Sequence, residues 1–220
     1  MFSQSFGADV YGTKARVIRI EADVSDGLPS FAMVGFPSAQ VREAQERVRT
    51  AFKNNRLCLP PKKVTVNFAP ADMKKEGAGF DLPVAAAVLA AAGILEPDLL
   101  EGVMIVGEIS LNGEIHGVAG VLPRVIRARE LGLRFCVIPE ENIREGNLVK
   151  DMPVFGVKSL NAMIRCLRDP NTYTAAYQEK EKTENKPEIP KVDFADICGQ
   201  EGARRAAEIA VSGFHNILFI

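Results

Sequence analysis

The chain has 220 residues, of which 47% are hydrophobic and 25% charged, with 27 basic and 28 acidic groups. This balance is typical of a folded globular protein and excludes a wholly disordered chain, and the formal charge of −1 excludes a general attraction to nucleic acid or anionic membranes. No apolar run reaches the ~18 residues of a membrane helix, and the first residues do not resemble a secretory signal, so we expect a cytoplasmic protein without a membrane partner.

The first half of the chain predicts strands around two helices. Strands are indicated from Gly12 to Ile20, from Phe31 to Val34 and from Lys63 to Phe68. Pro37 and Ser38 open a helix that ends at Asn54 and Asn55, and its apolar side recurs every three or four residues. The residues on that side are Val41, Ala44, Val48, Ala51 and Phe52.

A second, almost wholly apolar helix is predicted from Leu82 to Ala92. Asp81 is a good N-cap for it, and Gly93 can end it. A helix that is apolar on all sides must be buried on most of them.

The strongest local signal is Asn112-Gly113, a dipeptide that favours a type I′ turn between two strands. Around it the sequence predicts a strand at Val103–Val106, a helix at Val121–Leu131, and another strand at Phe135–Ile138. Ser159 should cap a short helix that runs to Leu167.

The cysteines and histidines do not form a metal-binding pattern. No two cysteines are close in sequence. Neither histidine has three acidic residues near it in the sequence that could complete a metal site. We therefore expect free thiols and no metal site. The cysteines are Cys58, Cys136, Cys166 and Cys198.

The segment after residue 168 is polar and includes the stretch QEKEKTENKPEIP, which predicts a linker. Beyond it a helix ends at Gly213, and residues 216–220 form an apolar strand at the end of the sequence. One helix and one strand cannot enclose a core, so we expect the chain to be the front of a longer protein. The expected divisions are a domain at 1–168, a linker at 169–192, and the truncated start of another domain at 193–220.

Three segments resemble one bacterial family. Residues 107–142 (GEISLNGEIHGVAGVLPRVIRARELGLRFCVIPEEN) resemble the Lon protease domain and the Lon-like domain of the recombination protein RadA. Residues 70–84 resemble the signature loop and helix of the YifB/ComM family, the magnesium chelatase-like AAA+ ATPases. Residues 196–200 and the helix after them resemble the entry to an AAA+ module.

The resemblance covers nearly the whole chain and implies its fold. We expect an α+β Lon protease-like domain, a fold shared with the second domain of ribosomal small-subunit protein five. A truncated P-loop α/β module should follow it.

Lon-type peptide cleavage requires a serine nucleophile and a neutral lysine that takes its proton. Aligning the Lon pattern with this chain places Gly79 at the serine and Arg124 at the lysine. Glycine carries no nucleophile, and arginine keeps its proton, so we expect no catalytic residues here. Ser110 is a conceivable substitute, but it also fits a surface hydroxyl in a hairpin.

The resemblance to AAA+ proteins implies that Ile197, Gly199 and Gln200 lie beside the adenine of ATP. The alternative is that Gly199 forms a turn and Gln200 opens the helix. ATP and Mg²⁺ are expected as cofactors of the intact protein, and none is expected on this chain, because it contains no phosphate-binding loop.

Two predicted helices carry an excess of positive charge. Residues 37–56 contain five basic and two acidic groups, and residues 121–134 contain four and one. If the helices share a face, their arginines could contact DNA phosphates; otherwise these are ordinary solvated faces. The candidate contacts are Arg42, Arg49, Arg124 and Arg127.

By resemblance, the intact protein would be a ring-forming ATPase, expected to be a hexamer, that acts on DNA as a ComM-like branch-migration motor. The first domain would bind DNA, guide the substrate or assemble the ring. The alternatives are a chelatase-type ATPase subunit that remodels a protein partner, and a Lon-like serine peptidase.

Overall fold

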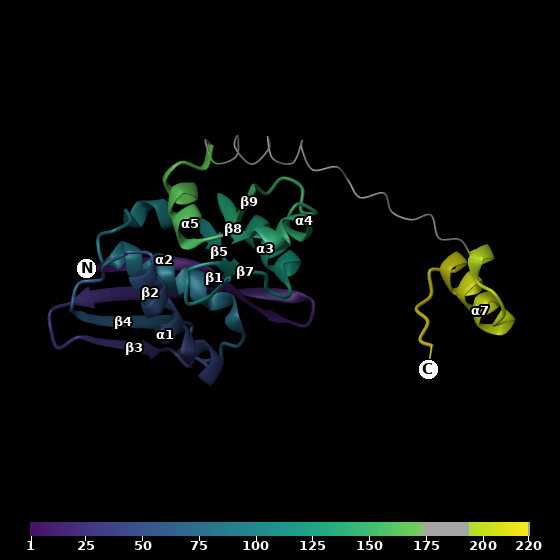
Figure 1. Ribbon diagram of the computed structural model, residues 1–220, viewed down its shortest axis with the longest axis horizontal. Helices are drawn as coiled ribbons and strands as arrows, with labels where there is room; N and C mark the ends of the chain where they lie inside the picture. The colour runs from purple at the N-terminus through teal and green to yellow at the C-terminus, as the bar shows by residue number, and fades with distance from the viewer. Residues whose placement is uncertain (172, 174–193, 220) are drawn as a thin grey trace. The chain divides into compact units, whose positions relative to one another are not determined.

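The computed structural model describes residues 1–171, 173 and 194–219. The chain divides into two compact units, residues 1–178 and residues 179–220, and each is described by itself (Figure 1). Most of the linker predicted at 169–192 lies outside the described residues. Within them, no helix is both long and apolar enough to cross a membrane.

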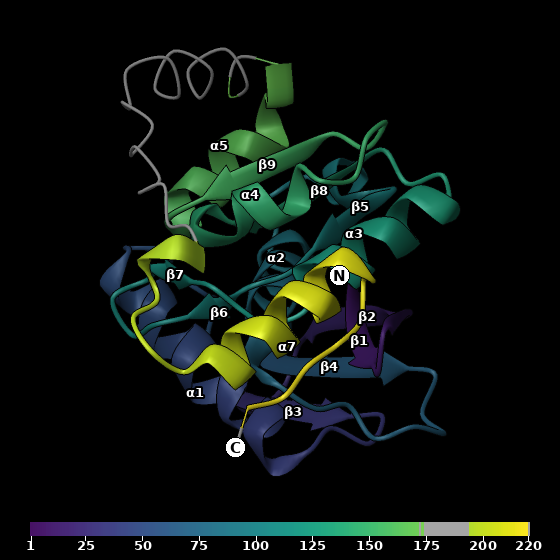
Figure 2. The same ribbon diagram turned by 90° about the vertical axis from the view of Figure 1, so that its right-hand side faces the viewer.

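The first unit is built on a seven-stranded sheet with the order β3-β4-β2-β1-β5-β8-β9. In Figures 1 and 2 it runs from β3 at the bottom to β9 at the top. The strands are β1 (Phe2–Tyr11), β2 (Lys14–Ser25), β3 (Ser30–Val34), β4 (Lys63–Ala69), β5 (Val103–Ile105), β8 (Phe135–Pro139) and β9 (Val154–Val157). A separate two-stranded ribbon contains β6 (Glu108–Ile109) and β7 (Ile115–His116).

The helices of the first unit are α1 (Ala39–Asn54), α2 (Asp81–Ala91), α3 (Val121–Glu130), α4 (Ile143–Gly146) and α5 (Leu160–Arg168). Short 3₁₀ turns occur at η1 (Ala78–Phe80), η2 (Pro97–Leu100) and η3 (Glu140–Asn142). The second unit contains η4 (Phe194–Asp196) and α7 (Glu201–Ser212).

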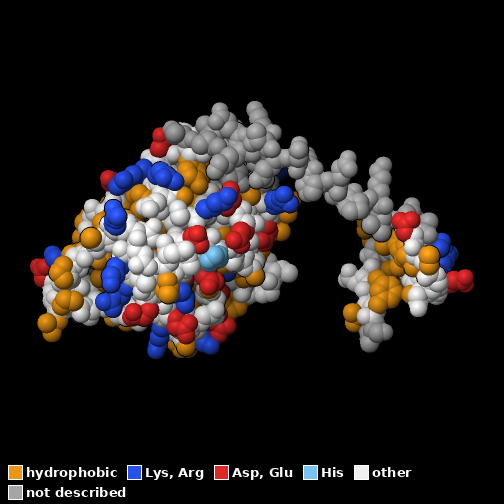
Figure 3. Space-filling model, viewed as in Figure 1, with side chains coloured by type: hydrophobic (Ala, Val, Ile, Leu, Met, Phe, Trp, Pro, Cys, Tyr) orange, Lys and Arg blue, Asp and Glu red, His pale blue; other side chains and the backbone are white. Residues whose placement is uncertain are grey.

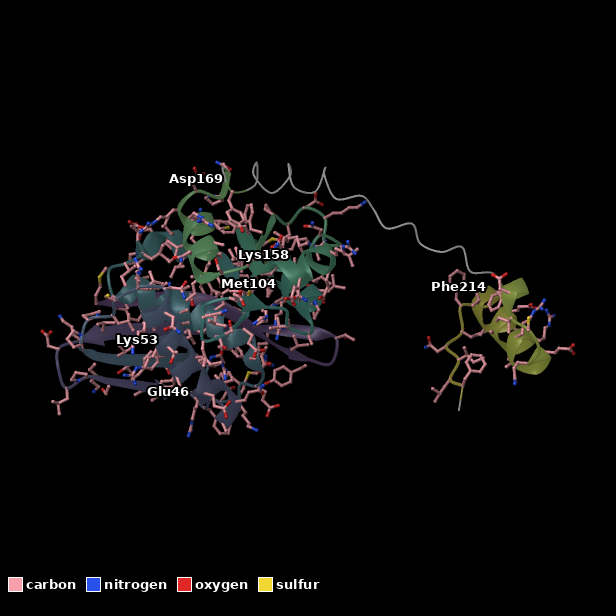
Figure 4. The ribbon with its side chains drawn as sticks, in the orientation of Figure 1. Glu46, Lys53, Met104, Lys158, Asp169 and Phe214 are labelled. Carbon is pink, nitrogen blue, oxygen red and sulfur yellow. The ribbon has the colours of Figure 1, made fainter. Side chains whose placement is uncertain are left out.

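Helices cover both faces of the sheet. Alternation along β5 sends Val103 and Ile105 into the core cluster that contains α1, α2 and α5. Met104, labelled near the centre of the unit in Figure 4, points into the other cluster, under α3 and α4. The two basic helices, α1 and α3, therefore lie on opposite faces of the sheet.

The apolar helix α2 is buried along its whole length, as its composition predicted. It packs on β1 and β2, where the hydroxyls of Ser3 and Ser5 donate hydrogen bonds to the carbonyls of Ala87 and Pro83. These two bonds satisfy hydroxyls that would otherwise be costly to bury.

The sequence-based elements are largely confirmed. Helix α1 buries the five predicted residues. Gly93 follows the end of α2 and has a positive φ of +76°. Ser159 caps α5, since its hydroxyl accepts a hydrogen bond from the Ala162 N–H. Helix α7 ends at Gly213, as expected. The fold contains interleaved helices and strands, and four of the six neighbouring strand pairs are parallel.

Four local predictions were wrong or incomplete. The central strand β1 was not predicted, and β2 begins at Lys14, after a turn at Gly12. Asp81 is the first residue of α2 and does not cap it. Of the strand predicted at 216–220, residues 216–219 form no strand and are exposed, and residue 220 lies outside the described residues.

The Asn112-Gly113 hairpin is present, but its turn is not type I′. That turn needs a positive φ at two consecutive residues, and here Gly113 has φ +87° while Asn112 does not have a positive value. The Gly113 N–H instead donates to the Ser110 carbonyl, and the Ser110 N–H donates to the Glu114 carbonyl. The hairpin therefore has a three-residue loop, in which a turn is followed by a glycine with positive φ, and not the two-residue loop of a type I′ turn.

Candidate functional site

The structure brings together the two positions at which the Lon pattern requires its catalytic pair. Gly79 lies in η1, which leads directly into α2, and Arg124 lies in the first half of α3. A Cβ at position 79 would be 3.5 Å from Arg124 Nη2 and 3.4 Å from Val106 Cγ1. The two aligned positions, Gly79 and Arg124, therefore lie side by side in the structure.

Arg124 is held in place by backbone carbonyls. Its side chain is only 6% exposed; Nε donates to the Ala8 carbonyl at 2.9 Å and Nη1 to the Ala119 carbonyl at 2.6 Å. Burial lowers the pKa of Arg124, while the carboxylates of Asp9 and Glu145 oppose this shift. A guanidinium nonetheless stays protonated in proteins, so Arg124 cannot accept a proton from a nucleophile.

Ser110 is the conceivable substitute for the missing nucleophile. It lies in the β6–β7 turn, and its hydroxyl donates to Asn112 Oδ1 and the Glu114 carbonyl. Both partners are turn acceptors of the hairpin, so the hydroxyl supports the local loop.

Among the described residues, no group of three or more His, Cys, Asp or Glu side chains could hold a metal ion. The thiols of Cys136 and Cys166 are buried, and those of Cys58 and Cys198 are exposed.

The loop before η1 is fastened by Lys75, whose burial the sequence did not predict. This lysine is 0% exposed, and its Nζ donates to the carbonyls of Gly35 at 2.9 Å and Met73 at 2.6 Å, and also to that of Pro70. Burial lowers the pKa of Lys75, opposed by the negative charges of Asp72 and Asp9. Lys75 therefore stabilises the loop through buried hydrogen bonds and is not a surface cation.

A buried ion pair fixes the start of α2 against α1. Arg47 Nε and Nη2 donate to the two Asp81 oxygens at 2.7 and 2.9 Å, and the Ile109 N–H donates to the same carboxylate. Burial raises the pKa of Asp81 and the guanidinium opposes that shift, while the hydrogen bond to Asp81 raises the pKa of Arg47. This forked geometry explains why Asp81 is not free to cap the helix.

The four candidate DNA-contacting arginines do not form one surface. Arg42 and Arg49 are exposed on α1, whereas Arg127 lies half-buried on α3 and pairs with Glu130 at 2.8 Å. Arg124 is buried beneath α3, so its guanidinium is not available to a phosphate. Figure 3 shows basic side chains in several separate groups on the face that it presents. Contact of Arg42 and Arg49 with DNA stays a prediction.

The predicted nucleotide contacts lie in the second unit. Ile197 is 40% exposed, Gly199 has φ +71°, and Gln200 precedes α7 with φ +50°. The described residues 194–219 include no phosphate-binding loop, so these three residues alone do not make a complete nucleotide site. Their role as adenine contacts stays a prediction.

Comparison with known proteins gives the family. A family model described as subunit ChlI of Mg-chelatase matches residues 20–142, more than half of the chain, and a second, magnesium chelatase, subunit ChlI, matches residues 193–220. The chain belongs to the YifB/ComM family of magnesium chelatase-like proteins. This confirms the family resemblance drawn from residues 70–84 and 196–200.

The similar proteins include the competence protein ComM of Haemophilus influenzae, 38% identical over 210 residues that cover 95% of this chain and 41% of that protein. YifB of Escherichia coli is 35% identical over 209 residues, covering 95% and 40%. The chain thus spans about two fifths of these relatives. Lon protease 2 of Bacillus subtilis is 26% identical over 153 residues, covering 62% of this chain and 27% of that protein.

Proposed function

We propose that this chain is the front, non-peptidase part of a longer AAA+ ATPase that processes DNA, as a ComM-like branch-migration motor. In this proposal the first unit has a Lon protease-like fold, and the second begins the ATPase domain. ATP and Mg²⁺ would bind to the part of the protein that follows residue 220, and the complete protein would assemble into a ring, expected to be a hexamer.

The observation that carries the non-peptidase role is the guanidinium of Arg124 beside Gly79. A serine peptidase of the Lon type needs a hydroxyl and a neutral amine at these two places. Here there is no hydroxyl, and the cation is tied to the carbonyls of Ala8 and Ala119. The position beside Gly79 is therefore filled by a fixed cation and lacks the groups that perform the chemistry.

The DNA-processing role is supported by the similarity to the competence protein ComM over 95% of the chain. Within the longer protein, the first unit would bind DNA, guide it to the motor or help to assemble the ring. Arg42 and Arg49 on α1 are the two candidate arginines that remain exposed.

A longer protein that includes the residues after Ile220 tests the proposal. We expect ATP hydrolysis that increases when DNA is added, and no cleavage of an unfolded substrate protein by the same preparation. ATPase activity that ignores DNA would contradict the DNA-processing role. Cleavage that is lost in Ser110→Ala would contradict the non-peptidase role.

A chelatase-type remodelling ATPase is the second candidate, because the matching family models describe a magnesium chelatase subunit. The same ATPase assay separates the two. A chelatase-type motor would respond to a protein partner that inserts metal into a porphyrin, and it would not respond to DNA.

A further inference from the structure

The end of the β1–β2 hairpin forms a surface that the proposed function has not used. The register pairs Tyr11 with Lys14 and Asp9 with Arg16, so the chain turns through Gly12 and Thr13. These four paired side chains share one face of the hairpin because residues alternate across a strand. Ala8 and Val17, on the opposite face, belong to the core under α3.

Hollows lie on both sides of this hairpin end. One, of about 530 Å³, lies between the hairpin and α3, where Ile126 and Arg127 line it. The other, of about 460 Å³, lies between the hairpin and the loop that contains Met73 and Lys74. Tyr11 and Arg16 line both hollows, so the two form a continuous surface around the hairpin.

This surface has unbalanced positive charge. Arg127 and Lys74 are neutralised by Glu130 at 2.8 Å and Glu76 at 2.6 Å. Lys14 and Arg16 are exposed, and neither has a carboxylate within ion-pair distance in the described part of the chain. Two free cations therefore remain at the hairpin end.

The nearby acid, Asp9, lies opposite Arg16 in the register and offsets part of the positive charge, but it makes no ion pair with either cation and is held by backbone N–H groups. Its side chain is 6% exposed, and its oxygens accept hydrogen bonds from the N–H groups of Val10 and Glu76. Its carboxylate thus links the hairpin by a hydrogen bond to the loop that contains Glu76. Arg16 Nη1 contacts the sulfur of Met73.

An aromatic side chain stands beside the free cations. Tyr11 is 50% exposed, and its hydroxyl donates to the Lys74 carbonyl at 3.0 Å, which fixes the ring between the hollows. An aromatic ring beside cations is the combination that binds single-stranded nucleic acid, with bases stacking on the ring and phosphates on the cations. Lys14 and Arg16 are two residues apart on one strand, about 7 Å, so they can meet neighbouring phosphates.

We propose that the β1–β2 hairpin end binds single-stranded DNA, with Tyr11 stacking against a base and Lys14 and Arg16 contacting the backbone. This rests on the proposed DNA-processing function and assigns a place on the first unit where a separated strand is held. Stacking on Tyr11 requires an unpaired base, so the site should favour a single strand over a duplex.

The test measures binding of a fluorescent thymidine oligonucleotide of about 20 nucleotides, and of a duplex of equal length, to this chain. Lys14→Ala/Arg16→Ala should weaken single-strand binding about tenfold or more. The slope of log affinity against log salt should fall by about 1.4, because each lost contact to a single strand removes about 0.7. The matched control is Arg144→Ala/Lys150→Ala, which removes the same charge from exposed positions and should bind like the unchanged chain.

Variants at position 11 separate stacking from charge. Tyr11→Ala should weaken single-strand binding roughly fivefold or more with an unchanged salt slope, and Tyr11→Phe, which keeps the ring, should bind normally. All variants should keep the thermal unfolding midpoint of the unchanged chain, because the altered side chains are exposed.

Three results would overturn the inference: equal binding of single strand and duplex, normal binding by Lys14→Ala/Arg16→Ala, or equal losses in the control pair. Failure here is distinct from failure of the proposed function. If Arg42→Ala/Arg49→Ala abolishes binding while the hairpin variants bind normally, the DNA-processing role stands and the hairpin site is wrong. If DNA does not stimulate the longer ATPase, the proposed function fails whatever the hairpin variants do.

Discussion

Gly79 is not required by backbone geometry or by lack of space. Its φ is outside the left-handed region, and a Cβ there would meet its nearest neighbours at 3.4 Å and beyond, ordinary contact distances. We therefore expect Gly79→Ser to fold, with a change in unfolding free energy below about 1 kcal/mol in urea titrations. It should not cleave an unfolded substrate, because Arg124 remains protonated beside the new hydroxyl.

Gly79→Ala is the matched control for this variant, since it adds the Cβ without the hydroxyl. Peptide cleavage by Gly79→Ser that is absent from Gly79→Ala would show that some other group activates the hydroxyl. That result would refute the assignment of Arg124 as the group that silences the site.

The four cysteines should react in two classes. Burial raises the pKa of both Cys136 and Cys166 to about 12, so at pH 8 only about one thiol in ten thousand is the reactive thiolate. Cys58 and Cys198 are exposed. A colorimetric disulfide reagent should therefore label two thiols quickly in the folded chain and four after unfolding. Rapid labelling of more than two would show that the core opens.

The same thiols predict a loss of stability at alkaline pH. In the unfolded chain they ionise near pH 8.5, about 3.5 units below their folded pKa of about 12, so the folded state binds more protons above pH 9. Their contribution is fully present below about pH 8.5 and is lost as the pH rises towards 12, at about 1.4 kcal/mol per unit for each thiol. Urea titrations from pH 7 to pH 10.5 should show this fall, and Cys136→Ala should have a shallower one.

The positions of Gly79 and Arg124 could be found in the sequence because the Lon pattern fixes both along the chain. The burial of Lys75 could not, because the surrounding residues 72–76 are mostly polar or charged and read as a solvated loop. The three carbonyls that accept hydrogen bonds from its Nζ lie between 2 and 40 residues away from Lys75 in the sequence. No local pattern encodes such a cage.

The loop between β4 and η1 depends on Lys75. Its backbone also bonds to the segment before α1, with the Ser38 N–H donating to the Lys75 carbonyl at 3.0 Å. Lys75→Met keeps the apolar stem but leaves three buried carbonyls without this donor, so we expect a loss of at least about 2 kcal/mol of unfolding free energy in urea.

The neighbouring lysine supplies the control for this prediction. Lys74 is exposed and pairs with Glu76, a surface interaction whose removal costs about 0.5 kcal/mol or less. Lys74→Met should therefore be close to neutral. Equal effects of the two substitutions would mean that the carbonyl cage does not stabilise the loop.

Most helices and strands could be predicted because their apolar residues recur at the right spacing, as in α1. Strand β1 escaped detection because its buried positions are small or polar, including Ser3, Ser5 and Ala8. Their burial is explained by α2, whose carbonyls accept from both serines. The turn after Ser110 was predicted in place but not in type, since its loop length depends on how the strands pair.

At the scale of the whole molecule, both core clusters consist of residues from the first unit. In the second unit large apolar side chains are exposed, including Phe214 (99%), labelled in Figure 4, and Leu218 (80%). We expect a chain that stops at residue 178 to keep the thermal midpoint of the longer one. It should also bind less of a dye that fluoresces on apolar surfaces. A midpoint lowered by several degrees would show that the second unit supports the first.

Helices α1 and α3 lie on opposite faces of the sheet. Each helix is amphipathic and basic, and its own sequence does not state which face of the sheet it covers. That choice follows from the direction in which the chain crosses over the sheet, between the parallel neighbours β3 and β4 for α1 and between β5 and β8 for α3. A joint basic surface was therefore an expectation that only the path of the chain in space could correct.

The sheet has a seam where its halves meet. Strand β1 pairs along its length with β2, which follows at once in the chain, but its other side meets β5 at Phe6 and Met104, about 100 residues later. On the ribosome, a hairpin made early must wait for its second neighbour, with one row of peptide groups open to other nascent chains. Incomplete chains that end before β5 are thus the species most exposed to misassociation. Once β5 is made and pairs with β1, the open edge of the hairpin is covered.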